Sequence, residues 1–293
     1  MKKVLVIGSI SIDNVTYSSI LPGPGTTVFG EAFLSNIGGK GANQACAIHF
    51  LGGDVEFFGS VGADDNGERV KKFLKSVDLR ANLKISDKST GVACITIDSH
   101  TAENRIVIVP GSNMDITRQD IDKINFSKFD FLLIQLENPI DTVCYAMKKA
   151  KEHGLTVILN PAPYHEVPSS SFKDIDFFIP NEHELESFTQ NINGDFEERA
   201  KSLIKQGIKK IIVTLGEKGS LYVDEKQSFV VAPLKVNAID TTGAGDSYCG
   251  AFLTALAEGK DIKSAMEFAS KASSITVTRK GAIASLPHRS DID

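Results

Sequence analysis

Residues 240–246, DTTGAGD, place small residues and two carboxylates directly before the apolar run SYCGAFLTALA. This pattern is typical of a loop that enters a helix, and the first N–H groups of a helix have no acceptor within it. Gly243, Ala244 and Gly245 would expose those groups with almost no side chain in the way, which favours binding of an anion. Asp246, inside the first turn, could take a proton from a hydroxyl group or could simply cap the helix.

Phosphoryl transfer is the reaction that these features would suit. It needs donors around the migrating phosphoryl group and a base for the proton of the attacking hydroxyl. The sequence contains no GxxxxGK[ST] motif, which excludes a P-loop enzyme as the source of the pattern. After the first apolar run, KVLVIG, comes SISID rather than GxGxxG, which disfavours a dinucleotide site.

A second glycine-rich motif, NIGGKGANQA, spans residues 36–45. Its glycines allow close approach of the backbone to a ligand, and Lys40 and Asn43 can reach the hydroxyl groups of a polyol. The same residues could equally open a helix, GANQACAIHFLG, with Gln44 and Ala45 in its first turn. The motif therefore predicts either a polyol contact or a plain helix start.

Composition narrows the class of protein. The chain has 293 residues, of which 42% are hydrophobic and 24% charged, as in ordinary globular proteins. Its net charge of -5 argues against nucleic acid or an anionic membrane as the partner and favours a small ligand. The four cysteines are widely spaced without a CxxC pair, which predicts reduced thiols and a cytoplasmic location. The N-terminal apolar run is too short for a signal peptide or a membrane span and predicts a buried strand.

The pattern of apolar runs predicts the fold class. Short buried runs alternate with amphipathic segments such as PIDTVCYAMKKAKEHG, which has Pro139 just inside its start and Gly154 just past its end. This alternation indicates a doubly wound α/β domain, a parallel sheet with helices on both faces. Residues 10–37 and 90–111 depart from it and predict a small second sheet, placed to act as a lid. No linker divides the chain, so residues 1–293 are predicted to form one domain.

GGKGANQA and DTTGAGD resemble the two signatures of the PfkB, or ribokinase-like, family of carbohydrate kinases. Further blocks resemble the ribokinase branch of that family, in order and over essentially the whole chain: GSISID, STGVA, QLE, NPAP, PNEHE, TLGEKG and VTRKGAIASLP. The resemblance implies a three-layer α/β/α fold with a β-sheet lid. It also implies transfer of the γ-phosphoryl group of ATP to the 5-hydroxyl of D-ribose.

The resemblance implies a role for each matching residue. Asp246 would be the catalytic base, and the backbone of Gly243, Ala244 and Gly245 would form the anion hole. The implied sugar contacts are Ser11, Asp13, Gly39, Lys40, Asn43 and Glu137, together with Asp246.

For the nucleotide, the resemblance implies that Asn181 and Glu184 help to place Mg²⁺ and the phosphates of ATP, largely through water. His183, between them, is expected at the surface. The implied nucleotide contacts further include Thr214, Gly216, Gly219, Gly245 and Ser270.

The resemblance also implies a potassium site and a homodimer. The potassium site would use the side chains of Asp240 and Ser285, together with the main-chain carbonyls of Thr242, Thr276, Arg279 and Gly281. The lid sheet would pair two subunits.

Two positions depart from the family pattern. Ser11 stands where ribokinases commonly have an asparagine that contacts the sugar, which leaves 2-deoxyribose or a different pentose open as the substrate. Ser270 stands where the bacterial enzymes commonly have a histidine near the adenine. The sequence also leaves open a kinase for a different sugar or a nucleoside, and a non-catalytic sugar sensor, although the presence of Asp246 disfavours the sensor.

Overall fold

The computed structural model describes residues 1–101, 103–190 and 192–292. Thirteen strands are found in this described part of the chain, and nine of them form the main sheet. The main-sheet strands are β1 (Lys3–Ile7), β4 (Asp54–Gly62), β5 (Ala81–Ser86), β8 (Phe131–Ile134), β9 (Thr156–Leu159), β10 (Phe177–Phe178), β11 (Ile211–Thr214), β12 (Ser220–Val223) and β13 (Ser228–Val231).

The main sheet has the order β13-β12-β11-β10-β9-β8-β1-β4-β5. From β11 to β5 all neighbouring strands are parallel, as the sequence predicted. At the other edge the sheet differs from the prediction, because β12 and β13 are antiparallel to their neighbours. Only short turns join β11, β12 and β13, and short turns connect antiparallel strands, whereas parallel strands need a longer crossover.

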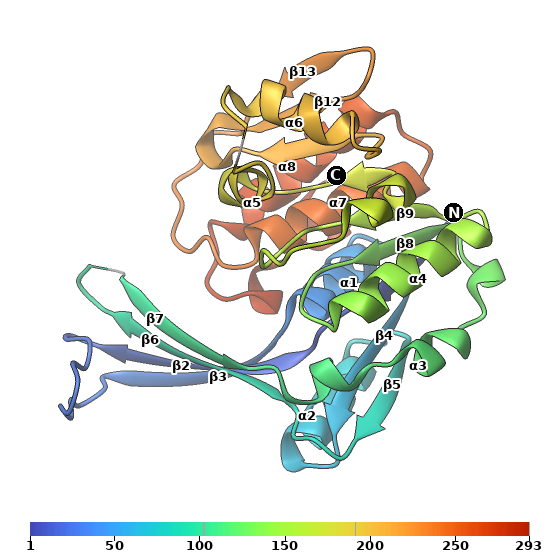
Figure 1. Cartoon of the computed structure of the whole chain (residues 1–293). Coiled ribbons are helices and arrows are strands. Elements are labelled where there is room, and N and C mark those ends of the chain that lie inside the picture. Colours follow the sequence, from blue (N-terminus) through green and yellow to red (C-terminus); the bar gives the residue numbers. More distant parts are fainter. Residues whose placement is uncertain (102, 191, 293) are drawn as a thin grey trace.

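Helices cover both faces of the main sheet (Figure 1). Their bounds are α1 (Lys40–Phe50), α2 (Asp65–Ser76), α3 (Arg118–Asp122), α4 (Ile140–Glu152), α5 (Glu182–Phe188), α6 (Phe196–Ile204), α7 (Ala244–Ala257) and α8 (Ile262–Thr276). Alternate strand residues point to opposite faces. Val4 and Val6 of β1 therefore join the core under α1, α2, α7 and α8, whereas Leu5 and Ile7 join the core under α3 to α6.

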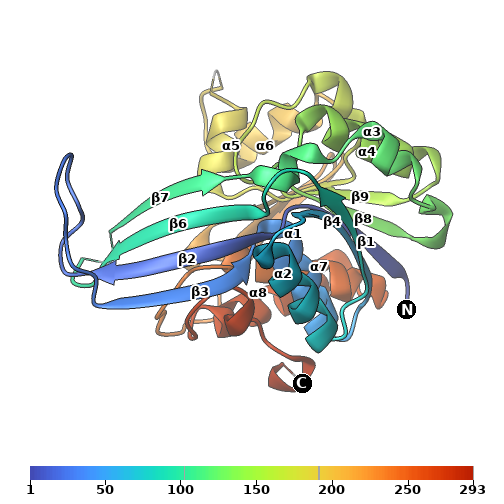
Figure 2. The same ribbon diagram turned by 90° about the horizontal axis from the view of Figure 1, so that it is seen from below.

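The second sheet contains four strands in the order β3-β2-β6-β7 and projects from the main sheet (Figures 1 and 2). Its strands are β2 (Ser11–Ser18), β3 (Ala32–Gly38), β6 (Gly91–Asp98) and β7 (Asn104–Val109). They lie within the two segments, 10–37 and 90–111, from which the sequence predicted this sheet, except that β3 ends one residue later, at Gly38. Residue 102, in the predicted hairpin, lies outside the described residues.

Two helix starts differ slightly from the sequence prediction. Helix α1 begins at Lys40, with Gly39 at its N-cap, so Gln44 lies inside the helix and not at its opening. Pro139 is the N-cap of α4, one residue before the predicted position, and Gly154 follows the helix with a φ of 80°. Within the described residues, no helix has the length and apolar character that crossing a membrane requires.

Candidate active site

The site lies where the carboxyl ends of the parallel strands meet the N-termini of α1 and α7. Ser9 follows β1, Glu137 follows β8 and Asn160 follows β9, and these three strands are neighbours in the main sheet. The chain runs from β1 to one side of the sheet and later returns to the other side, at β8. Such a switch in strand order opens a crevice at the carboxyl ends, which is where open α/β sheets bind ligands.

Asp246 is 7% exposed and is held by two side-chain amides of α1. The Nδ2 of Asn43 donates to its Oδ2 at 2.8 Å, and the Nε2 of Gln44 donates to its Oδ1 at 2.9 Å. The N-cap of α7 is Gly243, and among the described residues no side chain makes a capping hydrogen bond there. Of the two roles open from the sequence, the plain cap is therefore wrong, and the carboxylate is instead held at the edge of the crevice.

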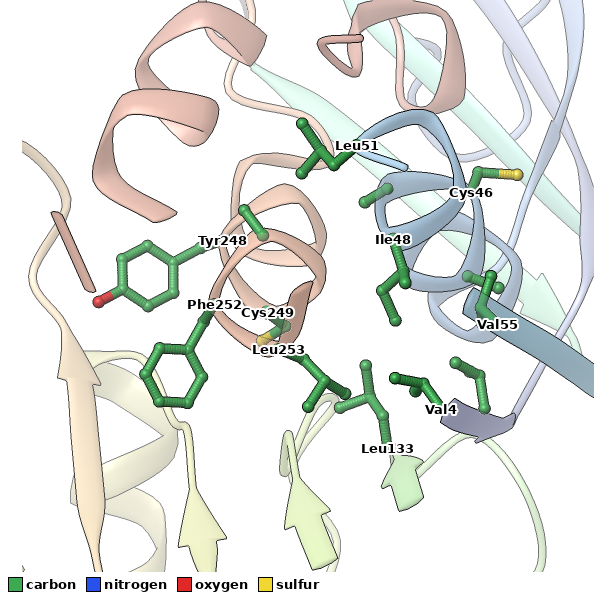
Figure 3. Close-up of a cluster of buried hydrophobic side chains, with 14 of the residues drawn as sticks. Val4, Cys46, Ile48, Leu51, Val55, Leu133, Tyr248, Cys249, Phe252 and Leu253 are labelled. Atoms are coloured by element: carbon green, nitrogen blue, oxygen red, sulfur yellow. The ribbon is translucent and has the colours of Figure 1, made fainter. Parts of the chain in front are cut away.

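Small residues let α1 and α7 approach closely enough for these contacts. A Cβ on Gly250 would lie 2.5 Å from the Cβ of Ala47 and 3.0 Å from the carbonyl oxygen of Gln44. Figure 3 shows the two helices side by side over the sheet, with Ile48 and Leu253 directed toward it. At the start of α1, a Cβ on Gly41 would lie 2.6 Å from the backbone of Gly8, so this helix also abuts the end of β1.

Lys40 and Glu137 lie beside Asp246. The N–H of Lys40 donates to Glu137 Oε2 at 3.0 Å, and the hydroxyl of Ser9 donates to the same oxygen. Burial alone lowers the pKa of Lys40, but the charges of Asp246, Glu137 and Glu184 outweigh it and raise this pKa above its ordinary value. Lys40 is therefore a firmly charged cation among carboxylates.

Asp13, on β2 of the second sheet, belongs to the same group of charged residues. Its Oδ1 accepts the hydroxyl of Ser11 at 2.9 Å, and a Cβ on Gly38 would lie 2.0 Å from its Oδ2. Glycine at position 38 thus leaves room for this carboxylate. Burial raises the pKa of Asp13, and the charges of Glu137 and Asp246 add to the rise.

Asn43 has one polar atom to spare at this site. Its Nδ2 is bound to Asp246, but its buried Oδ1 has no hydrogen-bond partner among the described residues. Buried amide oxygens are nearly always hydrogen-bonded, and an unpaired one costs free energy. This acceptor, on a side chain that is bound to Asp246, suits a ligand that carries hydroxyl groups.

At the start of α7, the N–H of Ala244 donates to the carbonyl of Thr241 at 3.2 Å, whereas among the described residues the N–H groups of Gly243 and Gly245 have no backbone acceptor. Gly243, at the end of the loop before α7, has a left-handed conformation, with a φ of 76°. Apart from the chain neighbours of Gly245 and the backbone of its own helix, no atom of the described residues lies within 4 Å of a Cβ position on Gly245. Asp240 holds the loop in place, because its carboxylate accepts the N–H of Thr242 at 2.9 Å and that of Gly281 at 2.8 Å. Burial would raise the pKa of Asp240, but these hydrogen bonds outweigh it and lower this pKa.

The residues matched to a potassium site lie around this loop. The N–H of Arg279 donates to the carbonyl of Thr276 at 3.0 Å, and the hydroxyl of Ser285 donates to that of Ala282 at 2.7 Å. The guanidinium of Arg279 is directed at Asp291, 3.1 Å away. Together with Asp240, Thr242 and Gly281, this donor set consists of carboxylate, hydroxyl and carbonyl oxygens, which suit a hard cation.

The predicted nucleotide residues form a second group along the same edge. Asn181 and Glu184 make a reciprocal capping box at the start of α5, and Asn181 also forms a β-bridge with Thr214. Burial raises the pKa of Glu184. Gly216 and Gly219 have φ values of 54° and 92° in the turn after β11.

Two other residues from the sequence prediction lie on helices outside this turn. Ser270 is buried in α8, where its carbonyl accepts the hydroxyl of Ser273 from the same helix. The side chain of His183, on α5, is 92% exposed, as the sequence predicted.

Gln44 is the site residue that sequence reasoning missed. The motif predicts a helix opener at this position, yet the side chain is fully buried and contacts Asp246, Asn160 and Gln135. All three partners lie in blocks that the sequence singled out, GAGD, NPAP and QLE. Nothing in the sequence pattern distinguishes an amide buried between two helices from one on a helix surface.

Comparison with known proteins places this site in a family. The model of the pfkB family carbohydrate kinases matches residues 1–289. A ribokinase of Schizosaccharomyces pombe is 36% identical and covers 100% of this chain and 97% of its own, and a deoxyribokinase of Salmonella typhi is 36% identical and covers 97% and 95%. The structure of Arabidopsis thaliana ribokinase complexed with ribose and ATP superimposes with a TM-score of 0.90 at 29% identity, covering 99% of this chain and 97% of that one. The chain, with its ribokinase-like α/β fold, belongs to the pfkB family of carbohydrate kinases.

Proposed function

We propose that this protein is an ATP-dependent ribokinase, which transfers the γ-phosphoryl group of ATP to the 5-hydroxyl of D-ribose and releases ADP and D-ribose 5-phosphate. The observation that carries the proposal is the placement of Asp246. Its buried carboxylate lies in the first turn of α7, is held by Asn43 and Gln44, and adjoins both the N–H groups of the anion loop and a set of polar groups suited to a polyol.

In the proposed reaction, Asp246 accepts the proton of the 5-hydroxyl as that oxygen attacks the γ-phosphorus. The bond between this phosphorus and the β,γ-bridging oxygen breaks, and ADP leaves with the electron pair. The N–H groups of Gly243, Ala244 and Gly245 would stabilise the charge on the migrating phosphoryl group. The N–H of Ala244 would have to turn to the phosphoryl group from the carbonyl of Thr241, to which it donates at 3.2 Å.

The sugar would be held by groups on both sheets. Asp13 and Glu137 can each accept more than one hydroxyl, and the unpaired Oδ1 of Asn43 can accept another. Lys40 supplies a cation and a donor on the same side. Gly39, with a φ of 90° at the N-cap of α1, keeps the backbone open to the ligand.

The metal assignments belong to the same proposal. Asn181 and Glu184 would place Mg²⁺, largely through water, and Mg²⁺ would neutralise the phosphates of ATP. Thr214, Gly216, Gly219 and Ser270 would contact the nucleotide. The oxygen set around Asp240 fits K⁺, which would hold the anion loop in shape. Asp240 already fixes that loop through Thr242 and Gly281.

The second sheet would act as a lid that closes over the sugar and excludes water from the γ-phosphate. Its strand β7 exposes Ile106, Val107, Ile108 and Val109, and β3 exposes Phe33. These apolar side chains support pairing of two subunits through the lid. The four free cysteines and the acidic net charge agree with a cytoplasmic enzyme that has no nucleic-acid or membrane partner.

A specific observation favours 2-deoxyribose as the second candidate substrate. The hydroxyl of Ser11 is turned to Asp13 Oδ1, and one of the relatives is a deoxyribokinase. The first test is ADP formation with D-ribose and 2-deoxy-D-ribose, measured in parallel for the wild type and Ser11→Asn. We expect the wild type to prefer ribose in kcat/KM, and Ser11→Asn to increase that preference by roughly tenfold through one more hydrogen bond to the sugar.

Equal or better use of deoxyribose by the wild type would overturn the ribose assignment while leaving the kinase assignment in place. If no pentose or nucleoside stimulates ADP formation, the proposed catalytic function is wrong. If Ser11→Asn leaves the ratio of kcat/KM for ribose to that for 2-deoxyribose unchanged, position 11 does not discriminate between the two sugars.

Gly38→Ala is expected to weaken ribose binding by roughly tenfold, since displacing Asp13 would forfeit about one hydrogen bond to a charged group. The new Cβ would lie 2.0 Å from Asp13 Oδ2 and would force that carboxylate to move. The measurement is the dissociation constant of ribose by calorimetry. Gly23→Ala is the control, because the nearest atom to its Cβ outside the adjoining residues would be the hydroxyl oxygen of Thr26, 3.7 Å away. Equal affinities in both variants would exclude Asp13 as a close sugar contact.

A further inference from the structure

We propose that Gln44 is a positioning residue that sets the orientation of the catalytic carboxylate of Asp246. This inference rests on the proposed function, in which Asp246 is the base. Gln44 is fully buried, and its Nε2 lies 2.9 Å from Asp246 Oδ1 and 2.9 Å from Asn160 Oδ1. Its Oε1 accepts the Nε2 of Gln135 at 2.6 Å. Every polar atom of this side chain is therefore engaged, and none is left for a substrate.

The hydrogen bonds around Gln44 have a defined direction. The Nδ2 of Asn160 donates to the main-chain carbonyl of Ile179 at 2.8 Å, which turns the Oδ1 of Asn160 toward Gln44. Gln44 must then present its NH₂ group, because the opposite orientation would set its oxygen against those of Asn160 and Asp246. The carbonyl of Ile179, just after β10, thus sets the orientation of the Asn160 amide, which in turn sets that of Gln44. As a result, the NH₂ group of Gln44 faces the carboxylate of Asp246.

This arrangement separates two roles on consecutive residues of α1. Asn43 donates to Asp246 Oδ2 and keeps a free oxygen for a ligand, whereas Gln44 donates to Oδ1 and contacts only protein atoms. Two donors on different oxygens fix the plane of the carboxylate. Each oxygen still has a lone pair, so the carboxylate can accept the hydroxyl proton in a defined direction.

The consequence for kinetics is specific to a positioning role. Loss of the Gln44 donor should leave the sugar and nucleotide contacts of the other residues in place but let the carboxylate of Asp246 rotate out of line. We expect Gln44→Met, which keeps the length of the side chain, to lower kcat by roughly 10- to 50-fold because small misplacements of a reacting group are costly. The KM values for ribose and ATP should change by no more than about threefold, because the contacts that bind both substrates equally before and during the reaction are retained.

Gln44→Glu supplies a second readout. It sets a new carboxyl group against Asp246, and two carboxyl groups at that distance share a proton. We expect the acidic limb of the pH dependence of kcat to move to higher pH in this variant. Loss of packing alone would not move it.

Thr254→Val is the matched control. Thr254 lies on α7 and, like Gln44, is fully buried. Its hydroxyl donates to the carbonyl of Gly250 within the same helix, away from the crevice. The kcat and pH profile of this variant should equal those of the wild type. A Gln44→Met enzyme with kcat within threefold of the wild type, or one whose KM rises as much as its kcat falls, would overturn the proposal.

Wild-type turnover with ribose, measured first, reports separately on the proposed function. A crystal structure of Gln44→Met tests the positioning without any activity. The proposal expects Asp246 to adopt a different side-chain rotamer. An unchanged carboxylate, still bound to Asn43, would contradict it even if the enzyme proves to act on another substrate.

Discussion

Asp246→Asn is expected to lower kcat for ribose phosphorylation by roughly 10²- to 10⁴-fold, the range that removal of a general base produces. An amide cannot take the proton of the 5-hydroxyl. It also places an NH₂ group against the NH₂ group of Asn43 or of Gln44, because both residues donate to the carboxylate. The measurement is steady-state ADP formation at saturating ribose and ATP, with a burst experiment to confirm that the chemical step has slowed.

Asp261→Asn is the control for this variant. Asp261 is the N-cap of α8 and accepts the N–H of Ser264 at 3.0 Å, so it also puts a carboxylate at a helix N-terminus. Asparagine caps helices as well as aspartate does, and the substitution should leave kcat unchanged. If Asp246→Asn retains most of the wild-type turnover, Asp246 is not the base.

Asp13→Ala is expected to lower kcat/KM for ribose by roughly 10²- to 10³-fold, mainly through KM. Each hydrogen bond from a sugar hydroxyl to a charged group contributes about 1.5 to 3 kcal/mol, and a carboxylate can accept two. Asn14→Ala is the matched control, since Asn14 follows on the same strand and faces the other side of the lid, where it accepts the hydroxyl of Ser35 at 2.7 Å. Equal losses in both variants would point to damage to the lid and not to a sugar contact.

The raised pKa of Asp13 gives this contact a pH dependence. Burial, with the charges of Glu137 and Asp246, raises the pKa of Asp13 above the ordinary 3.8, so the carboxylate becomes protonated at a higher pH than a typical aspartate. The affinity for ribose should therefore fall as the pH falls through this raised pKa. Calorimetric titration with ribose, without ATP, from neutral to acidic pH would measure the effect. Asp13→Asn should flatten it.

Titration of Asp13 should affect folding stability in the opposite direction from ribose affinity, so that its contribution to stability rises as the pH falls. A carboxyl group whose pKa is raised in the folded state binds its proton more tightly there than in the unfolded chain. Its contribution to the free energy of unfolding is fully present below pH 3.8 and is lost as the pH rises through the raised value. Urea unfolding of the wild type and Asp13→Asn over the same pH range would show a difference that grows toward neutral pH.

The sequence by itself determined the layered fold and the place of Asp246 in the first turn of a helix. Strand and helix periods are local properties, so the parallel strands, the helices between them and the two segments of the second sheet followed from residue patterns. The same holds for the helix start at Gly243 and for Asp246 within it, because both depend on neighbouring residues. The antiparallel direction of β12 and β13 was missed. The direction of an edge strand depends on the turns that connect it, and the spacing of apolar residues does not show this.

The tertiary structure alone decided which side chains meet. Asn43 and Gln44 are some 200 positions from Asp246 along the chain, and they reach it only because Gly250 and Ala47 let α1 and α7 approach. That contact excluded a plain cap for Asp246 and gave Gln44 a role that its neighbours in sequence do not indicate. Gly38 likewise proved to leave room for Asp13 only once β2 and β3 were paired. Such contacts depend on how elements that are distant in sequence pack together. A sequence pattern describes only one element at a time and does not record this packing.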